Sequence, residues 1–358
     1  MPPTLVPRGV WDTMQPMSEL RTVEWINGRV RMIDQTKLPD KFVYVSYKDY
    51  REIARAIKEM VVRGAPAIGV AAAMGMALVA NSSHAKTKQQ LISGLEAAAE
   101  VLRKSRPTAW NLFWAVDRML QVARSATGEP KEIATNVVEE SLKIAEEDVK
   151  ANKRIGEYGA ALLNDGDRVL THCNTGTLAT VSYGTALAPI RTAIKQGKRL
   201  QVVATETRPR LQGAKLTTYE LLRDRIPVTL IVDGAVGYVM KKGLVNKAIV
   251  GADRVTTKFV ANKVGTYLIA LAAQANEIPF YVAAPTSTFD LRSSHSEVQI
   301  EERNPQEVTH IGGKRIVPKG VKVFNPAFDI TPVELVEGFI TEKGVVRADM
   351  VRAGVLST

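Results

Sequence analysis

The chain has 358 residues, enough for about two domains, and its 45% apolar and 24% charged residues are typical of a folded globular protein. Its 48 basic and 37 acidic side chains leave a net charge of +11. The single cysteine, Cys173, excludes an internal disulfide and a cysteine-based zinc site, and favours a reducing compartment.

The positive charge has three interpretations. The most favoured interpretation is excess charge that keeps the protein soluble, and the second is binding of a small anionic ligand. Nucleic acid is the least favoured, because the chain has no basic tail and no alternation of basic and aromatic residues.

Neither the N-terminus nor the longest apolar run carries a targeting or membrane signal. Residues 1–8 lack the charged and then apolar pattern of a signal peptide. Residues 65–80 are mostly Ala, Gly and Val, and fall short of the ~20 strongly apolar residues of a membrane span. We therefore expect a buried helix there and a cytoplasmic protein.

The first part of the chain predicts a β-meander followed by helices. Asn27-Gly28 tolerates the positive φ of a type I′ turn, so a hairpin is expected between residues 23–26 and 29–33. Another strand is expected at residues 42–45. Apolar spacing then predicts helices over residues 50–62, 68–79, 89–104, 109–126 and 130–163.

After residue 165, short apolar runs alternate with helical stretches. Strands are expected at residues 168–172, 200–204, 228–232, 248–250 and 279–283. Helices are expected at residues 178–196, 217–225, before Lys247, and at 264–276. Such alternation predicts an α/β fold with a doubly wound, Rossmann-like parallel sheet. We expect an N-terminal domain of residues 1–135 and a C-terminal catalytic domain of residues 136–358.

Chemically capable side chains follow the predicted strands. In open parallel sheets, ligands bind beyond the carboxyl ends of the strands. The residues at those ends are Cys173, Glu206, Arg208, Asp233, Asp253, Arg254, Thr286 and Ser287. Polar residues are common at such positions, but a thiol, several carboxylates and two guanidiniums on one rim favour a reactive site.

The usual cofactor motifs do not occur. The sequence has no G-x-G-x-x-G, no G-x-x-x-x-G-K-[ST] and no G-x-S-x-G. Its four histidines, His84, His172, His295 and His310, lack the spacing of metal ligands. These observations argue against common nicotinamide chemistry, nucleotide hydrolysis and zinc hydrolysis, and leave a reaction without cofactors.

Cys173 and Asp253 each have two interpretations. A lone cysteine is often a small buried apolar group, but Cys173 lies between a strand and the start of the next helix, where a thiol pKa can be lowered. Asp253 directly follows an apolar strand, and partial desolvation there would raise its pKa toward the range useful for proton transfer. Alternatively, Asp253 caps the next segment or pairs with Arg254.

Several basic and small residues lie where an anion could bind. Arg63-Gly64-Ala65 opens an apolar helix, where free N–H groups and a guanidinium suit a phosphate. Asn262-Lys263 precedes the predicted helix 264–276 in the same way. Gln212 before another helix and Arg106 between two helices are similar candidates. Ordinary capping and solvated bases would explain each of these features taken alone.

Taken together, these segments resemble the methylthioribose-1-phosphate isomerase family. The matching stretches run in the expected order from about residue 20 to 347: residues 23–25, 63–69, 106–108, 170–176, 206–209, 212–214, 251–254, 262–267 and 324–329. The wider family includes archaeal ribose-1,5-bisphosphate isomerases and the regulatory subunits of eukaryotic translation initiation factor 2B.

The resemblance implies conversion of 5-methylthioribose 1-phosphate to 5-methylthioribulose 1-phosphate in methionine salvage, with no metal or nucleotide cofactor. It implies that Cys173 and Asp253 are catalytic. It assigns substrate binding to Arg63, Gly64, Ala65, Arg106, Gln212, Asn262 and Lys263. It also implies a homodimer formed by the C-terminal domain, with a small sugar phosphate as substrate and neither nucleic acid nor membrane as partner.

Two rival functions stay open. Ribose-1,5-bisphosphate isomerase chemistry would need the same thiol, carboxylate and phosphate site, but the hairpin with Trp25 favours the methylthio substrate. A non-catalytic regulatory subunit of an initiation-factor-2B-like exchange complex is the rival of another class. The presence of both Cys173 and Asp253 argues against it.

Overall fold

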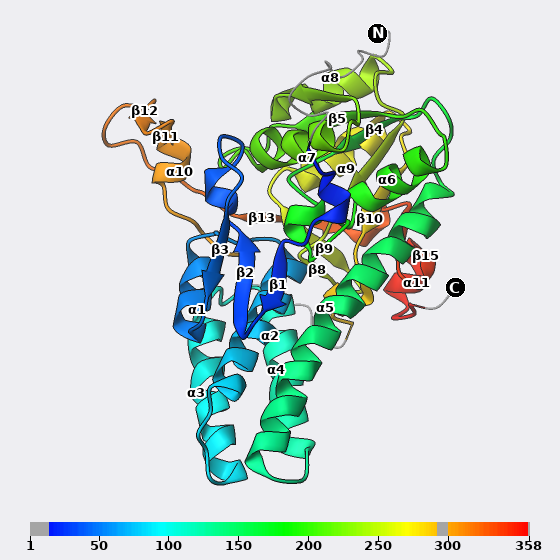
Figure 1. The fold of residues 1–358 in the computed structure, drawn as a ribbon. Coiled ribbons are helices and arrows are strands. Elements are labelled where there is room, and N and C mark those ends of the chain that lie inside the picture. The colour runs from blue at the N-terminus through cyan, green and yellow to red at the C-terminus, as the bar shows by residue number, and fades with distance from the viewer. Residues whose placement is uncertain (1–13, 292–299, 357–358) are drawn as a thin grey trace.

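The structure is a computed structural model that describes residues 14–291 and 300–356. One end of the molecule is built of long helices with a small sheet, and the other of a larger sheet covered by helices (Figure 1). Within the described residues, no helix is both long and apolar enough to cross a bilayer.

The N-terminal strands form the predicted meander. Strands β1 (Val23–Ile26), β2 (Arg29–Ile33) and β3 (Tyr44–Tyr47) pair antiparallel in that order. Asn27 and Gly28 have φ angles of 48° and 73°, as a type I′ turn requires. The hairpin prediction is thus confirmed, whereas the third strand lies two residues later than expected.

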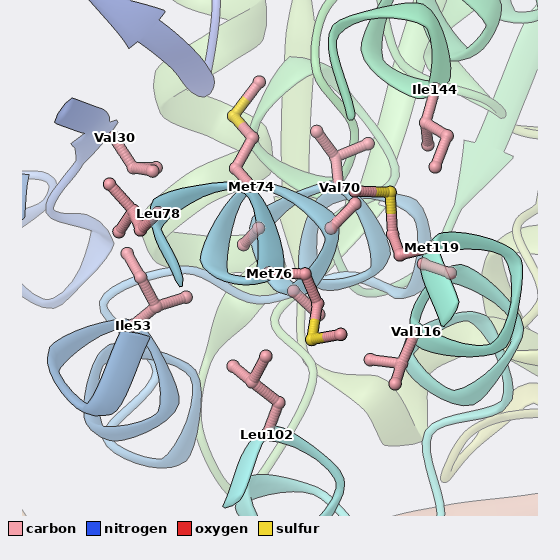
Figure 2. Packing of buried hydrophobic residues seen from close by; sticks show 14 of the residues in the cluster. Val30, Ile53, Val70, Met74, Met76, Leu78, Leu102, Val116, Met119 and Ile144 are labelled. Atoms are coloured by element: carbon pink, nitrogen blue, oxygen red, sulfur yellow. The ribbon is translucent and has the colours of Figure 1, made fainter. Parts of the chain in front are cut away.

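Five helices follow the meander. They are α1 (Tyr50–Lys58), α2 (Ala65–Asn81), α3 (Lys88–Ser105), α4 (Trp110–Ser125) and α5 (Pro130–Ala160). Helix α2 is apolar on every side because the others surround it. Figure 2 shows Met74 and Met76 pointing to opposite sides of α2, the latter toward Leu102 of α3.

Helix α5 joins the two ends of the molecule. Ile133 and Val137, in its first half, belong to the core around α2, while Ile155 and Ala160, near its end, pack against the larger sheet. The expected boundary after residue 135 falls within this helix.

The larger sheet has seven strands in the order β15-β14-β10-β7-β4-β5-β6. In chain order the strands are β4 (Arg168–Thr171), β5 (Gln201–Thr205), β6 (Val228–Ile231), β7 (Lys247–Val250), β10 (Phe280–Ala283), β14 (Gly338–Thr341) and β15 (Gly344–Arg347). All neighbouring pairs are parallel except β14 with β15. The predicted doubly wound, Rossmann-like class is confirmed.

Helices cover both faces of this sheet. The described ones are α6 (Leu187–Lys195), α7 (Thr218–Arg223), α8 (Val236–Lys241), α9 (Thr266–Ala275) and α11 (Ala348–Arg352). Residues of α6 and α7 share one core with the end of α5, and residues of α8 and α9 share the other.

The strand order reverses between β4 and β7. From β4 the chain proceeds through β5 to β6 on one side, and then continues through β7, β10 and β14 on the other. Ligands of open parallel sheets bind at such a switch point, beyond the carboxyl ends of the strands. Cys173 follows β4 and Asp253 follows β7, so both lie at this position.

Two expectations about helices were wrong. Residues 178–196 form a continuous helix only from Leu187, because the segment before it is a short 3₁₀ turn (Thr177–Ala179) and irregular chain. Asn262 and Lys263 do not open a helix, since they end β9 (Phe259–Lys263) and α9 begins at Thr266.

Strand β9 belongs to a second, antiparallel sheet. It lies between β8 (Arg254–Val255) and β13 (Phe328–Pro332). Before β13, α10 (Gln306–Thr309) and the hairpin of β11 (His310–Ile311) and β12 (Lys314–Arg315) project from the body (Figure 1).

Candidate active site

A cavity of about 60 Å³ lies at the switch point, between the helical end and the larger sheet. Every predicted site residue except Asn262 lines it: Arg63, Gly64, Ala65, Arg106, Cys173, Gln212, Asp253 and Lys263. Segments that are far apart in the sequence thus meet at this cavity. Arg63, for example, lines it together with Cys173, and its guanidinium contacts Asn174. The cavity is therefore lined by one thiol, one carboxyl and four cationic side chains, because Arg254 also lines it.

The start of α2 forms one wall of the cavity. Gly64 has a φ of 98°, and a Cβ atom there would lie 2.5 Å from backbone atoms of Ala179, so only glycine fits. The N-cap residue of α2 is Gly64, which has no side chain to cap the first turn. Its N-terminus therefore presents backbone N–H groups and the positive end of a helix dipole to the cavity beside Ala65.

Arg63 is held by the loop that follows β4. Its two terminal nitrogens donate to Asn174, one to the side-chain Oδ1 at 2.6 Å and the other to the backbone carbonyl at 2.9 Å. The Asn174 amide in turn donates to the buried carboxylate of Glu220 at 2.8 Å. These contacts fix the guanidinium of Arg63 next to Cys173.

Cys173 has a left-handed backbone with a φ of 60°, which is uncommon for a residue other than glycine. Two threonines hold it in this conformation. Its N–H donates to Oγ1 of Thr207 at 2.9 Å, and its carbonyl accepts from Oγ1 of Thr217 at 2.6 Å. The thiol is free, and the residue is only 6% exposed, so a substrate meets it in a largely dry cavity.

His172, the neighbour of Cys173, is a buried structural group. Its Nδ1 lies 2.6 Å from Oγ1 of Thr205 and its Nε2 lies 2.9 Å from the carbonyl of Val264. Burial lowers the pKa of His172 to about 4, so the ring is neutral at physiological pH. A carbonyl can only accept a hydrogen bond, and this assigns the proton to Nε2.

Asp253 lines the cavity from the segment between β7 and β8, and Lys263 lines it from the end of β9. Burial raises the pKa of Asp253, although the charges of Lys263, Arg106 and Arg63 oppose the shift. Burial lowers the pKa of Lys263, although Cys173 and Asp253 oppose that shift. Both shifts bring the two groups closer to the range in which protons are exchanged near neutral pH.

Lys263 and Gln212 offer groups suited to a polar ligand. Nζ of Lys263 donates to the carbonyl of Ala327 at 2.6 Å and lies 4.9 Å from the centre of the Phe328 ring. Gln212 is 7% exposed, and its Oε1 is buried without a hydrogen-bond partner in the part of the chain that the structure describes. An unpaired buried amide oxygen is costly, so it indicates a missing hydrogen-bond donor.

Asn262 lies outside the cavity lining. Successive side chains of a strand point to opposite faces, and its neighbours Ala261 and Lys263 are the ones that line the cavity. The amide of Asn262 donates instead to Oγ1 of Thr266 at 2.9 Å. Its predicted role in substrate binding remains a prediction.

Other residues predicted at the strand ends are mostly structural. Asp233 accepts hydrogen bonds from the backbone N–H groups of Thr207 and Arg208, at 2.8 and 2.6 Å. Thr286 pairs with Glu342 through its backbone N–H at 2.9 Å. Glu206, Arg208, Asp233, Thr286 and Ser287 do not line this cavity, whereas Arg254 does.

Several cavity residues were not predicted from the sequence. They are Met60, Ile68, Thr108, Ala109, Ala261, Ile300 and Phe328. Thr108 and Phe328 fall within segments that matched the family, and this match was the sequence signal that could have identified them. Among residues 14–291 and 300–356, no cluster of three His, Cys, Asp or Glu side chains is arranged to hold a metal ion.

Known proteins are similar to this chain over most of its length. Residues 61–348 match the Initiation factor 2 subunit family. A curated protein from Thermosipho africanus named methylthioribose-1-phosphate isomerase is 55% identical over 327 residues, which is 91% of this chain and 94% of that protein.

Two solved structures are also similar. The 5-methylthioribose 1-phosphate isomerase of Pyrococcus horikoshii is 45% identical, with a TM-score of 0.85 over 95% of this chain and 97% of that one. A protein of A. fulgidus described as translation initiation factor eIF-2B, subunit delta, is 48% identical, with a TM-score of 0.82 over 93% of this chain and 97% of that one. The chain belongs to the initiation factor 2 subunit family and, within it, to the methylthioribose-1-phosphate isomerases.

Proposed function

We propose that the protein isomerises 5-methylthioribose 1-phosphate to 5-methylthioribulose 1-phosphate, a step of methionine salvage. The observation that carries the proposal is that Cys173 and Asp253, from the ends of two neighbouring strands, line one cavity with Arg63, Arg106 and Lys263. Relatives that bear the name of this enzyme match along nearly the whole chain, which supports the same assignment.

The reaction explains why such a set of groups is needed. The anomeric oxygen of the substrate carries the phosphate, so the sugar ring must open by cleavage of the ring C–O bond while the phosphate stays on C1. A hydrogen then moves from C2 to C1, and the C2 hydroxyl becomes a carbonyl by losing its proton. Substrate and product have the same composition, so no oxidant or reductant is consumed.

Asp253 is proposed as the group that exchanges protons with the sugar oxygens. Its raised pKa favours a protonated carboxyl, which can donate to the ring oxygen as the ring opens. The resulting carboxylate can then accept the proton of the C2 hydroxyl. One residue would thus serve both steps and return to its starting form.

Cys173 is proposed to act beside C1 and C2. If the hydrogen moves as a proton, the thiol is placed to act as acid or base during the transfer. If it moves as a hydride, the water-poor cavity around Cys173 keeps C1 strongly electrophilic. Both routes need the thiol close to the reacting carbons.

The phosphate is proposed to bind at the start of α2. Arg63, Arg106 and Lys263 supply positive charge, while Gly64 and Ala65 supply the helix N-terminus. Holding the phosphate on C1 orients the two reacting carbons and stabilises charge as it develops.

The apolar part of the lining favours a methylthio group at C5. Met60, Ile68 and Phe328 contribute to the cavity surface. A second phosphate at C5 would place negative charge beside these apolar side chains, which argues against ribose 1,5-bisphosphate as the substrate.

An NMR assay of the purified protein tests the function. The protein is incubated with each of the two sugar phosphates in the presence of EDTA. Formation of methylthioribulose 1-phosphate alone supports the proposal, whereas turnover of only the bisphosphate would overturn the substrate assignment. Absence of turnover together with a stoichiometric initiation-factor partner in a pull-down would favour the regulatory subunit instead.

We also infer a cytoplasmic homodimer formed through the C-terminal part. Large apolar side chains are exposed on the edge strand β6 (Leu230) and just after it (Val232), and on α8 (Tyr238) and α9 (Leu268). A sheet edge that exposes large apolar side chains is suited to packing against a second copy of the chain. Light scattering should give twice the 39.1 kDa mass of the chain, and Leu230→Asp should lower it.

A further inference from the structure

Arg106 lines the cavity from the end of α3, and its guanidinium is paired with the carboxylate of Glu301. Its Nε donates to Oε2 of Glu301 at 3.1 Å, and its Nη2 forms an ion pair with the same oxygen at 2.9 Å. The side chains of Arg106 and Glu301 are only 10% and 19% exposed. Arg106 lines the cavity, whereas Glu301 is not among the lining residues.

Nη1 of Arg106 is left for a ligand. It makes no hydrogen bond in residues 14–291 and 300–356, whereas the opposite edge of the guanidinium is engaged by Glu301. An arginine held on one edge has lost much of its rotamer freedom before a ligand arrives, so less freedom is lost on binding.

Glu301 is itself part of a chain of alternating charges. Its Oε1 accepts from Nη1 of Arg303 at 2.6 Å. Nη2 of Arg303 donates to Oε1 of Glu307 at 2.9 Å, and the same oxygen accepts from Nη1 of Arg210 at 2.8 Å. The chain therefore runs from Arg106 at the helical end to Arg210 in the loop after β5.

The two ends of this chain flank the cavity. Arg210 lies two residues before Gln212, which lines the cavity from the sheet side, while Arg106 lines it from α3. The intervening carboxylates, Glu301 and Glu307, are half-buried. Burial alone would raise the pKa of Glu307, but its hydrogen bonds to Arg303 and Arg210 outweigh burial and lower it.

The backbone around Glu301 is well supported. Ala327 donates its N–H to the carbonyl of Glu301 at 2.8 Å, and Arg303 donates to the carbonyl of Asn325 at 2.9 Å. The carbonyl of Ala327 also accepts from Lys263 at 2.6 Å. The backbone of Ala327 thus links Glu301 to Lys263, a second cation that lines the cavity.

We propose that Glu301 is a positioning residue, which holds one edge of Arg106 so that Nη1 faces the cavity and binds the phosphate of the ligand. This inference rests on the anion-binding role of Arg106 in the proposed function. The opposite possibility, that Glu301 competes with the ligand for Arg106, predicts tighter anion binding when the carboxylate is removed.

Calorimetry with inorganic phosphate tests the proposal. The proteins compared are the wild type, Glu301→Gln, Arg106→Ala and the double variant, with Glu302→Gln as the matched control. Glu302 is the exposed neighbour, so its substitution removes the same charge outside the ion-pair chain. Glu301→Gln should weaken phosphate binding about tenfold, and Glu302→Gln should leave it unchanged.

The double variant separates positioning from a general structural effect. If Glu301 acts through Arg106, adding Glu301→Gln to Arg106→Ala should cause no further loss of phosphate affinity. Tighter binding by Glu301→Gln, an equal loss in both backgrounds, or no phosphate binding by the wild type would each overturn the proposal.

Enzyme kinetics provide a second readout. Glu301→Gln should raise KM for the sugar phosphate by a larger factor than it lowers kcat, because Arg106 binds the phosphate already in the ground state. Glu307→Gln, two links further along the chain of alternating charges, should raise KM by a smaller factor. An unchanged KM in Glu301→Gln would contradict the proposal. A wild type that binds phosphate but turns over neither sugar phosphate would disprove the proposed function and leave the positioning role standing.

Discussion

The core around α2 and the polar cluster behind Arg63 are both fully buried, but they are built in opposite ways. Around α2 the buried side chains are apolar, and Figure 2 shows them arranged on all sides of the helix. In the polar cluster, the carboxylate of Glu220 accepts from the N–H groups of Thr177 and Leu178 and from the side chains of Asn174 and Arg191, at 2.7 to 3.1 Å.

The difference indicates that the apolar core determines the stability of the fold, whereas the polar cluster determines the geometry of the site. Apolar burial is non-directional, so the core around α2 stabilises the fold without fixing any single atom. A buried carboxylate needs each of its donors in place, so the polar cluster fixes the loop that carries Cys173 and Asn174. Substitutions in the two regions should therefore have separable effects.

The largest effect is expected at the cavity itself. Cys173→Ser and Asp253→Asn should each lower kcat by at least about 10²-fold, the lower end of the range for acid–base groups. Neither substitution changes side-chain volume much, so the melting temperature should change little. Steady-state kinetics and thermal unfolding of the same preparations measure both quantities.

Asp165→Asn is the matched control for these variants, since Asp165 is an exposed carboxylate paired with Arg199 before β4. It should retain normal kcat. Near-normal turnover in either cavity variant would remove that residue from the mechanism.

A substitution in the core around α2 should lower the stability of the fold and leave kcat unchanged. Leu102 is fully buried against Gly75 of α2. Leu102→Ala should lower the free energy of unfolding by about 2–5 kcal/mol, because lost burial and a cavity both contribute. The kcat of the folded fraction should be unchanged.

Urea unfolding measures this loss, with Leu142→Ala on the exposed face of α5 as the control. The control should change stability by no more than about 0.5 kcal/mol. If Leu102→Ala instead lowered kcat at full stability, the separation between the two regions would fail.

The same division explains what the sequence could predict. Helices around α2 follow from apolar spacing, and the meander follows from Asn27-Gly28, because both signals are local. The helix expected from residue 178 does not form there, because Glu220 accepts the N–H groups of Thr177 and Leu178. That partner lies more than 40 residues away and leaves no local pattern.

The site was predictable in part for the same reason. Cys173 and Asp253 follow strands, so the sheet topology alone brings them to one edge. Lys263 was expected at a helix start, but its strand pairs with β13, which begins at Phe328. Glu301 has no local signal, since Arg106 is 195 residues away.

Asp148 lies where the two regions meet and should give a pH-dependent effect. This residue of α5 accepts from the N–H of Val181 at 2.7 Å and from Nδ2 of Asn152 at 3.0 Å. Burial raises its pKa to about 7, although these hydrogen bonds and the charge of Arg21 oppose the shift. The folded state therefore favours the protonated carboxyl.

Because the folded-state pKa is raised, the contribution of Asp148 to stability is greatest below about pH 4 and is lost as the pH rises toward 7. Asp148→Asn has no such titration. The free energy of unfolding of Asp148→Asn, relative to that of the wild type, should therefore increase from pH 5 to pH 7, by at most about 1.4 kcal/mol per pH unit. Urea unfolding at several pH values measures the difference, and a constant difference would contradict the assignment.

The smallest effect is expected at Gly94, which belongs to neither region. It lies exposed in the middle of α3, and a Cβ atom there would meet only Cγ1 of Val79, at 3.9 Å. Alanine is favoured over glycine within a helix by about 1 kcal/mol, so Gly94→Ala should stabilise the fold by roughly that amount. Urea unfolding and kcat are measured together, and kcat should not change.

Gly64→Ala makes the same chemical change at the cavity and should have the opposite sign. Its φ of 98° disfavours alanine, and the added Cβ would lie 2.5 Å from the backbone of Ala179. The N-terminus of α2 would have to move, so both stability and phosphate binding should fall. Equal responses at Gly64 and Gly94 would mean that the close approach at Gly64 can relax without cost, and that the α2 wall is less rigid than its contacts require.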